Sequence, residues 1–310
     1  MTQAILVAGA TGMLGSRIAH HLLLEEPATD VRLLVRPQTA TGPQRSVRLS
    51  PLVRRGARVV EGDLTDDASL DRATAGVDVI VSAVQGGPEV VVDGQLALVD
   101  AGKKNGVRRI LPSDFGLDFF DAPDGQNTMF DIRRVADETI QTSGLEHVHV
   151  LNGAFMDEFF ASSCPLIDVK NKVARFWGEG DERFDVTSVE DTARYAAKAA
   201  IDRSLPSGKF AVAGQHISFQ EIVDTVERVT SRTFKRERLG SLSDLRAWIA
   251  DKRRADADPS AVVAGSYQLL MLTARRLEQL QNHRYRDIVA ENFTEYLQRT
   301  PLNLTFDNCA

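Results

Sequence analysis

Three glycines near the start of the chain, Gly9, Gly12 and Gly15, have types and spacing that suit phosphate binding. Glycines at such a turn permit a sharp bend, let the backbone approach a pyrophosphate, and let the next helix pack closely on the preceding strand. The helix N-terminus adds N–H groups and a partial positive charge. A glycine triplet also occurs in ordinary loops, but this one lies directly between an apolar strand and an amphipathic helix. The expected contacts of this phosphate-binding loop are Gly9, Thr11, Gly12, Met13, Leu14 and Gly15.

Arginines follow the second apolar segment, where dinucleotide-binding folds place the residue that reads the adenosine ribose. An acidic residue there accepts a hydrogen bond from the ribose 2′-OH of NAD, whereas an arginine pairs with the 2′-phosphate of NADP. The stretch 31–60 contains no Asp or Glu, but it contains Arg36, Arg45 and Arg48. A solvated basic loop would look the same. The charge nevertheless favours NADP(H), with Arg36 and Arg45 as expected ligands.

Two further segment ends carry residues that suit a nucleotide. Asp63 and Leu64 follow the third apolar segment and are expected at the adenine edge, although Asp63 would equally serve the start of the next helix. The fourth segment ends in small residues that we expect beside the nicotinamide-side ribose and phosphates: Ser82, Ala83, Val84 and Gln85. Small residues suit any tight strand exit, so this second assignment is less specific than the first.

The common acid–base arrangements are missing from the sequence. Short-chain dehydrogenases commonly carry Tyr-x-x-x-Lys, and none of the four tyrosines here has a lysine four residues later. Tyr195 and Lys198 are three residues apart and are expected on a surface helix. His147 and His149 share one face of a strand, where we expect them to be packed. No Cys/His or Ser/His/Asp arrangement stands out, so nucleophilic catalysis of those kinds is not predicted.

The elements that must position these residues alternate regularly in the first half of the chain. Apolar or alternating segments predict six strands, at 4–8, 31–35, 58–61, 78–83, 107–111 and 147–151. Helical spacing predicts helices between them, at 13–23, 45–55, 66–75, 90–105 and 129–143. This alternation predicts an α/β fold with a doubly wound parallel sheet, which is Rossmann-like and binds its ligand at the carboxyl ends of the strands. All the nucleotide contacts named above follow such an end.

The alternation stops after the sixth predicted strand. Residues 1–153 are expected to form the NADP-binding domain and residues 154–310 a second, smaller, substrate-side domain, with 184–201 folding back onto the first. The second part has predicted strands at 173–177 and 209–212 and predicted helices at 189–201, 218–230 and 243–253. A mostly polar linker is expected at 255–260, and the stretch 267–297 is predicted to be largely helical.

Composition and charge exclude several classes of protein. With 310 residues, 43% of them hydrophobic and 26% charged, the chain matches an ordinary globular protein with a sizeable core. Its formal charge of −6 argues against general affinity for nucleic acid or for an acidic membrane. Only Cys164 and Cys309 are present, which predicts no disulfide framework and no metal site. With no signal peptide or membrane span evident, we expect a cytoplasmic protein.

Several short segments together resemble a known family. They are Gly-Ala-Thr-Gly-Met-Leu-Gly at 9–15, Leu-Val-Arg at 34–36, Gly-Asp-Leu at 62–64, Val-Ser-Ala-Val at 81–84, Leu-Pro-Ser-Asp-Phe-Gly at 111–116 and Asn-Gly-Ala-Phe at 152–155. On these segments the chain resembles the NmrA-like and isoflavone reductase-like group of atypical short-chain dehydrogenases. The resemblance extends well over the first two thirds of the chain and loosely over the remainder.

The resemblance implies an NADPH-binding protein, monomeric or homodimeric, whose small-molecule substrate lies between two domains. It implies hydride transfer to an aromatic or enone/carbonyl-type molecule. It adds three expected cofactor contacts, which are Ser113, Phe115 and Asn152. An apolar or aromatic substrate pocket would be lined by Phe155, Met156 and Phe159. An aromatic cluster of this kind is more often plain core.

One departure from the family pattern concerns the catalytic residue. The plant reductases of this group have a general acid or base in a Phe-x-x-Lys pattern, where this chain reads Phe-Asp-Ile-Arg at 130–133. Arginine stays charged, so Arg133 can polarise a carbonyl or hold a carboxylate but does not supply a proton. Water, or Asp114 relaying through Ser113, would have to supply it.

Three interpretations therefore stay open on the sequence. The first is a reductase with Arg133, Ser113 and Asp114 as its catalytic residues. The second is an NmrA-like regulatory protein that senses NADP(H) without turnover. The third is an epimerase or a sugar-nucleotide enzyme, which shares the glycine motif but usually needs the Tyr/Lys pair that is missing here.

Overall fold

The computed structural model describes residues 3–26, 28–37, 48–120, 122, 125, 128–160, 166–255, 259–273 and 276–300. The chain divides into two compact units. Unit 1 consists of Met1–Phe115, Met129–Leu151 and Thr192–Phe210. Unit 2 consists of Gly116–Thr128, Asn152–Asp191 and Ala211–Ala310. The domain boundary expected at residue 153 stays a prediction, and each unit is described by itself.

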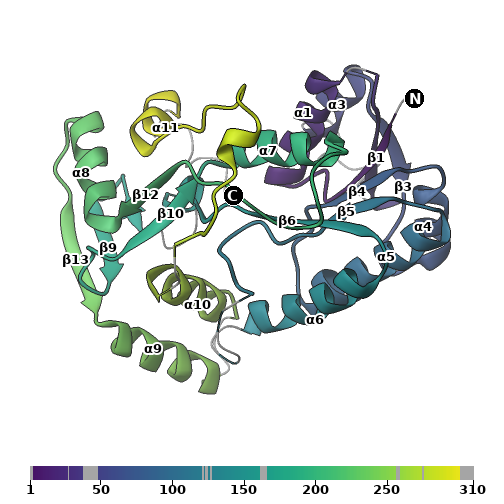
Figure 1. The fold of residues 1–310 in the computed structure, drawn as a ribbon. Coiled ribbons are helices and arrows are strands. Elements are labelled where there is room, and N and C mark those ends of the chain that lie inside the picture. The colour runs from purple at the N-terminus through teal and green to yellow at the C-terminus, as the bar shows by residue number, and fades with distance from the viewer. Residues whose placement is uncertain are drawn as a thin grey trace. The chain divides into compact units, whose positions relative to one another are not determined.

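Unit 1 is built on a seven-stranded sheet in the order β11-β6-β5-β4-β1-β2-β3 (Figure 1). Its strands are β1 (Ala4–Ala8), β2 (Asp30–Val35), β3 (Arg58–Glu61), β4 (Val79–Ser82), β5 (Arg109–Leu111), β6 (Glu146–Leu151) and β11 (Gly208–Ala211). Strands β1 to β6 pair in parallel, which confirms the predicted doubly wound sheet. The order reverses between β1 and β4, so the ligand of such a sheet lies outside the carboxyl ends of these two strands.

Helices cover both faces of this sheet, which is why β1 and β4 are buried along their whole length. On one face, α4 (Asp67–Thr74), α5 (Gln95–Lys104) and α6 (Thr128–Thr142) share a single apolar core with the strands. On the other face lie α1 (Met13–Glu25) and α7 (Val189–Ile201) (Figure 1). Lys198 of α7 forms an ion pair with Glu25 of α1. The short helix α3 (Ser50–Arg54) packs beside α1.

Two sequence predictions about these helices are wrong in detail. Tyr195 was expected on a surface helix, but its side chain is fully buried because α7 packs into the core of unit 1. The helix expected at 90–105 begins instead as a π-helical segment, Glu89–Gly94, which continues directly into α5. Gly94 lies against the side chain of Leu64, so a larger residue would have no room there.

A buried arginine fastens the segment after α7 to the sheet. Arg109 of β5 donates to the carbonyl oxygens of Ala199 at 3.0 Å, Asp202 at 2.6 Å and Leu205 at 2.6 Å. Its Nε donates to the carboxylate of Glu146 at 2.9 Å. Carbonyls at a helix C-terminus lack partners within the helix, and a guanidinium satisfies several of them at once.

Unit 2 contains two three-stranded sheets, with the orders β12-β10-β7 and β13-β9-β8. The strands are β7 (Ala154–Phe155), β8 (Ile167–Asp168), β9 (Val173–Trp177), β10 (Arg183–Thr187), β12 (Gln215–Ser218) and β13 (Lys235–Gly240). The helices are α8 (Phe219–Thr230), α9 (Leu242–Arg254), α10 (Pro259–Thr273) and α11 (Phe293–Arg299). No helix in the described parts of either unit has the length and apolar character needed to cross a bilayer.

The prediction of a largely helical stretch at 267–297 is wrong, because only its two ends are α-helical. Between α10 and α11, the backbone N–H groups of Leu277 and Gln281 donate to the Asp185 carboxylate and to the carbonyl of Ala211, at 2.7 and 2.8 Å. These long-range bonds satisfy donors that a helix would otherwise use. The polar linker expected at 255–260 is shorter than predicted, since α10 already begins at Pro259.

Candidate functional site

The loop after β1 requires glycine at two of its three glycine positions. Gly9 has a φ of +78°, and a Cβ there would lie 2.3 Å from the carbonyl oxygen of Ala83. A Cβ on Gly15 would lie 2.3 Å from the carbonyl oxygen of Gly9. The N–H of Gly12 donates to that same carbonyl at 2.9 Å and closes the turn. The loop is therefore pressed against the end of β4 on one side and against α1 on the other.

The first turn of α1 presents N–H groups that no side chain caps. The helix begins at Met13 after Gly12, whose backbone is extended, and the first turn contains no acidic residue. Gly9, Gly12 and Leu14 are only half-buried, and the side chain of Met13 is exposed. Free donors and an uncompensated positive helix end are what an anionic phosphate requires, so this loop fits the pyrophosphate of a dinucleotide.

Guanidinium groups flank this loop. Arg48 donates to the carbonyl oxygen of Thr11 at 2.7 Å, a contact that the sequence did not predict beyond the basic character of the stretch. Arg36 follows β2 and is exposed. The N–H and hydroxyl of Thr65 lower the pKa of the Asp63 carboxyl, and the charge of Arg36 adds to this effect against partial burial. Asp63 and Arg36 thus lie near each other at this edge. The predicted ligand Arg45 lies outside the described residues.

The ends of β4 and β5 are tied together by Ser113. Its hydroxyl donates to the carbonyl oxygen of Val84 at 2.7 Å, and its N–H donates to the side-chain oxygen of Gln95 at 2.7 Å. Gln95 is fully buried and was not predicted as a site residue. Ser82 is also fully buried, and its hydroxyl has no hydrogen-bond partner among the described residues. Of the other predicted contacts, Val84 and Phe115 are buried, Ala83 is half-buried and Gln85 is exposed.

The remaining predicted contacts belong to unit 2. Asn152 is fully buried, and its N–H donates to the carbonyl oxygen of Gly116 at 2.9 Å. Met156 and Phe159 are buried as well, and Phe159 packs on the rings of Phe184 and Phe293 at centroid distances of 6.0 and 6.2 Å. Phe155 is partly exposed. The three residues predicted to line a pocket thus lie in or beside an aromatic core, and the pocket itself stays a prediction.

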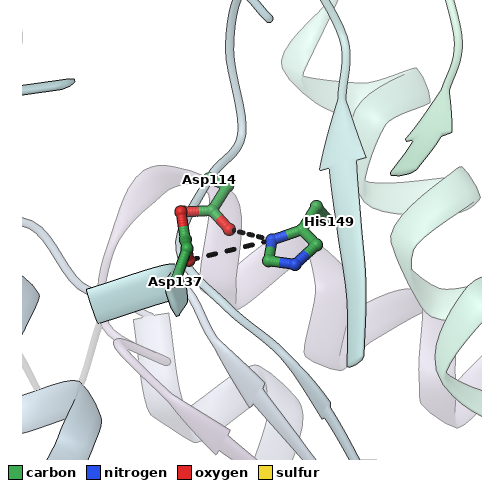
Figure 2. Close-up of side chains that lie close together, drawn as sticks. All are labelled: Asp114, Asp137 and His149. Atoms are coloured by element: carbon green, nitrogen blue, oxygen red, sulfur yellow. Dashed lines mark hydrogen bonds and ion pairs between the residues drawn. The ribbon is translucent and has the colours of Figure 1, made fainter. Parts of the chain in front are cut away.

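A second cluster of polar side chains is buried within unit 1 (Figure 2). Nδ1 of His149, on β6, lies 2.7 Å from Oδ2 of Asp114 and 3.8 Å from Oδ1 of Asp137. Asp114 follows β5, and Asp137 lies on α6. The side chains are at most 2% exposed. The sequence predicted a packed His149, but it did not predict the Asp137 partner.

Two carboxylates this close cannot both stay ionised in a buried place. Burial raises the pKa of Asp137 to about 10, with the charge and hydrogen bond of Asp114 adding to the effect and Arg133 opposing it. The ligand atoms of the three residues lie within 4.8 Å of one another, as a metal site would need. The 2.7 Å contact is, however, shorter than the roughly 3 Å between neighbouring ligands of a metal with bonds near 2.0 Å. A hydrogen bond between His149 and Asp114 accounts for the 2.7 Å contact.

Arg133 and Ser113 stand apart from this cluster in their bonding. Arg133 lies on the buried face of α6 and is 8% exposed. The side chain of Asp114 is bonded to His149, whereas the hydroxyl of Ser113 is bonded to Val84. The proton relay expected from Asp114 through Ser113 therefore lacks a connecting hydrogen bond, because the two side chains turn to different partners.

Comparison with known proteins agrees with this fold. The model of the NmrA-like family matches residues 1–282. Pinoresinol reductase 2 of Arabidopsis thaliana is 33% identical over 260 residues, covering 80% of each protein. Pinoresinol reductase 1 of the same plant is 34% identical over 210 residues, so the match spans 64% of that relative and 64% of this chain.

Among solved structures, the complex described as AtPrR2 with NADP+ and (+)pinoresinol is 27% identical in sequence. It covers 96% of this chain and 98% of its own, with a TM-score of 0.82. A family match over most of the chain and a shared fold confirm the resemblance seen in the sequence motifs: this chain belongs to the NmrA-like family.

Proposed function

We propose that the protein is an NADPH-dependent reductase of a small aromatic or enone/carbonyl-type molecule. The observation that carries the proposal is the uncapped glycine loop of Gly9 to Gly15 in a chain one third identical to pinoresinol reductase 2. The relatives are named as reductases, and a solved relative is described with NADP+, so the protein is an oxidoreductase and its cofactor is NADP(H). The chemical class of the substrate is what we propose beyond this.

The cofactor would be held by residues along the edge of the sheet. The loop and the first turn of α1 would bind its pyrophosphate, and Arg36 would bind the 2′-phosphate. Asp63 and Leu64 would lie at the adenine, with the stretch 82–85, Ser113, Phe115 and Asn152 toward the nicotinamide. When bound, NADPH supplies a hydride. The protein must then orient the acceptor and provide a proton, which comes from water or from the Asp114–Asp137 pair, since Arg133 keeps its own.

Turnover can be tested directly. We expect the purified protein to oxidise NADPH with at least one acceptor from a panel of aromatic enones, aromatic aldehydes and lignan benzylic ethers, including pinoresinol. NADPH affinity is measured in parallel by calorimetry. Tight binding of NADPH without oxidation by any acceptor would support the other interpretation, an NADP(H)-sensing regulatory protein without turnover.

A further inference from the structure

Arg133 is a buried cation, and two of its three guanidinium nitrogens have no hydrogen-bond partner among the described residues. On α6 it lies on the same face as Phe130, Ala136 and Ile140, all of them fully buried or nearly so. Its Nε and Nη1 are shielded from solvent and have no hydrogen-bond partner among the described residues. A buried guanidinium without acceptors is costly, because the charge loses hydration and gains nothing in return. Such a group needs an anion to complete its surroundings.

The neighbouring carboxylates do not fill this role. Asp131, on the same helix, is paired with Arg134. Asp114 is bonded to His149 at 2.7 Å. Asp137 lies one helical turn after Arg133, and the charge of Arg133 opposes the rise in the Asp137 pKa, but the two side chains form no ion pair within 4.0 Å in the described structure. No carboxylate of the described residues therefore accepts a hydrogen bond from Nε or Nη1 of Arg133.

We propose that Arg133 binds an anionic group of the substrate, a carboxylate or an oxyanion, through its buried Nε and Nη1. The proposal rests on the reductase function proposed above, because Arg133 of α6 contacts a substrate only if the protein has one. A guanidinium presents its donors as a planar fork that matches a carboxylate with two parallel hydrogen bonds. Lysine offers a point charge that gives up its proton when buried, so the two residue types select different chemistry.

The substrate class follows from this difference. A neutral acceptor would leave the Arg133 charge buried and unpaired, whereas an aromatic acid or a conjugated oxyanion would neutralise it. Sites built to bond a polar group reject ligands that lack it, because the site's own groups then stay unpaired. We therefore expect the protein to favour anionic aromatic molecules over neutral ones of the same shape.

The experiment compares benzoate with benzamide, its neutral counterpart of the same shape, on the NADPH-loaded protein by calorimetry. We expect benzoate to bind at least about ten-fold more tightly to the wild type, since a charge-assisted bidentate pair replaces a neutral contact. Arg133→Gln should abolish this ratio, and Arg133→Lys should retain part of it. The matched control is Arg134→Gln, on the same helix but paired with Asp131, and it should leave the ratio unchanged.

Three outcomes would overturn the proposal: equal or absent binding of benzoate by the wild type, an unchanged ratio in Arg133→Gln, or a loss of NADPH affinity in that variant in place of a loss of benzoate affinity. The last result would assign the guanidinium to a cofactor phosphate. The measurement needs no turnover. A protein that binds benzoate through Arg133 but never oxidises NADPH would therefore contradict the reductase function and leave the anion site standing.

Discussion

Nδ1 of His149 lies 2.7 Å from Oδ2 of Asp114, in a place where both side chains are almost completely excluded from solvent. This contact joins the segment that follows β5 to β6. It also fixes the residue that follows Ser113, whose own bonds to Val84 and Gln95 hold the neighbouring strand end. The bonds of Asp114 and Ser113 thus hold the ends of β4 and β5 in place.

The Asp114–His149 contact should be measurable as a coupling energy. We expect Asp114→Asn and His149→Gln each to lower the free energy of unfolding, and the double variant to lose less than the sum of the two. A hydrogen bond to a charged group predicts a coupling of about 1.5–3 kcal/mol. Urea unfolding of the four proteins gives this value. Strictly additive losses would mean that the two side chains are close without stabilising each other.

The buried proton on Asp137 predicts a specific pH dependence. Burial holds the pKa of Asp137 near 10, far above its ordinary value of 3.8, so the folded protein keeps a proton that the unfolded chain releases. The free energy of unfolding is therefore highest at low pH, where Asp137 is protonated in both states, and it falls as pH rises from 4 towards 10. For one proton the slope is about 1.4 kcal/mol of unfolding free energy per pH unit. Asp137→Asn mimics the protonated acid. This variant should remove the slope between roughly pH 5 and 8, which lies between the ordinary and the raised pKa of Asp137.

Glu138→Gln is the matched control for this experiment, because Glu138 is the next residue of α6 and is exposed. It should leave the pH dependence of stability as in the wild type. Both variants are followed by urea unfolding at several pH values. A wild-type slope that persists in Asp137→Asn would place the proton on another group.

The fold of unit 1 could be predicted because its signals are local. Short apolar runs, glycines that end helices and helical spacing of apolar residues predict β1 to β6 and the helices between them without reference to distant residues. The place of β11 could not be predicted, although a strand was expected at 209–212, because the order of strands in a sheet depends on tertiary packing. Tyr195 was misplaced for the same reason, since the helix pattern alone does not reveal how completely α7 is covered.

The residues of the candidate site also divide into those that the sequence could predict and those that it could not. Glycines and arginines that follow strand ends are recognisable from their order along the chain, because parallel strands bring all their carboxyl ends to one edge. The Asp114, Asp137 and His149 cluster could not be predicted, because its members come from a loop, a helix and a strand with no common spacing. A signal was nevertheless present: Asp137 interrupts the apolar face of α6, where an unpartnered acid would be costly.

The glycine loop can be tested with a pair of alanine variants that share backbone strain. Gly9 and Gly106 have φ values of +78° and +74°, but a Cβ on Gly9 would collide with the backbone at Ala83, whereas Gly106 has nothing within 4 Å. Gly106→Ala should cost about 1 kcal/mol of stability and leave NADPH binding intact. Gly9→Ala should lower NADPH affinity at least about ten-fold, because the phosphate-binding backbone must move. If calorimetry gives the wild type and Gly9→Ala the same affinity for NADPH, the loop does not bind the cofactor phosphates.

The choice between NADPH and NADH should depend on Arg36. Removing a guanidinium that pairs with the 2′-phosphate costs about 1.5–3 kcal/mol, so Arg36→Ala should lower NADPH affinity by roughly 10- to 150-fold. NADH affinity should stay unchanged, because NADH lacks that phosphate. Arg54→Ala is the control, since Arg54 is an exposed arginine of α3. If Arg36→Ala keeps its preference for NADPH, the phosphate is read by another group.

Arg109 should be among the most sensitive positions of unit 1. Its guanidinium is almost fully buried and satisfies three carbonyl oxygens between Ala199 and Leu205. Arg109→Met keeps most of the volume but removes the guanidinium that donates to these carbonyls, while Glu146 keeps its ion pair with Arg108, so we expect a loss of about 3–5 kcal/mol in unfolding free energy. Arg203→Met, at an exposed position of the same segment, should change stability by less than about 0.5 kcal/mol. Hydrogen exchange should show Arg109→Met losing protection first over 199–205, because the carbonyls that anchor this segment to β5 then lose their bonds to the guanidinium. Unchanged protection there would mean that the packing of α7, rather than the guanidinium, holds the segment in place.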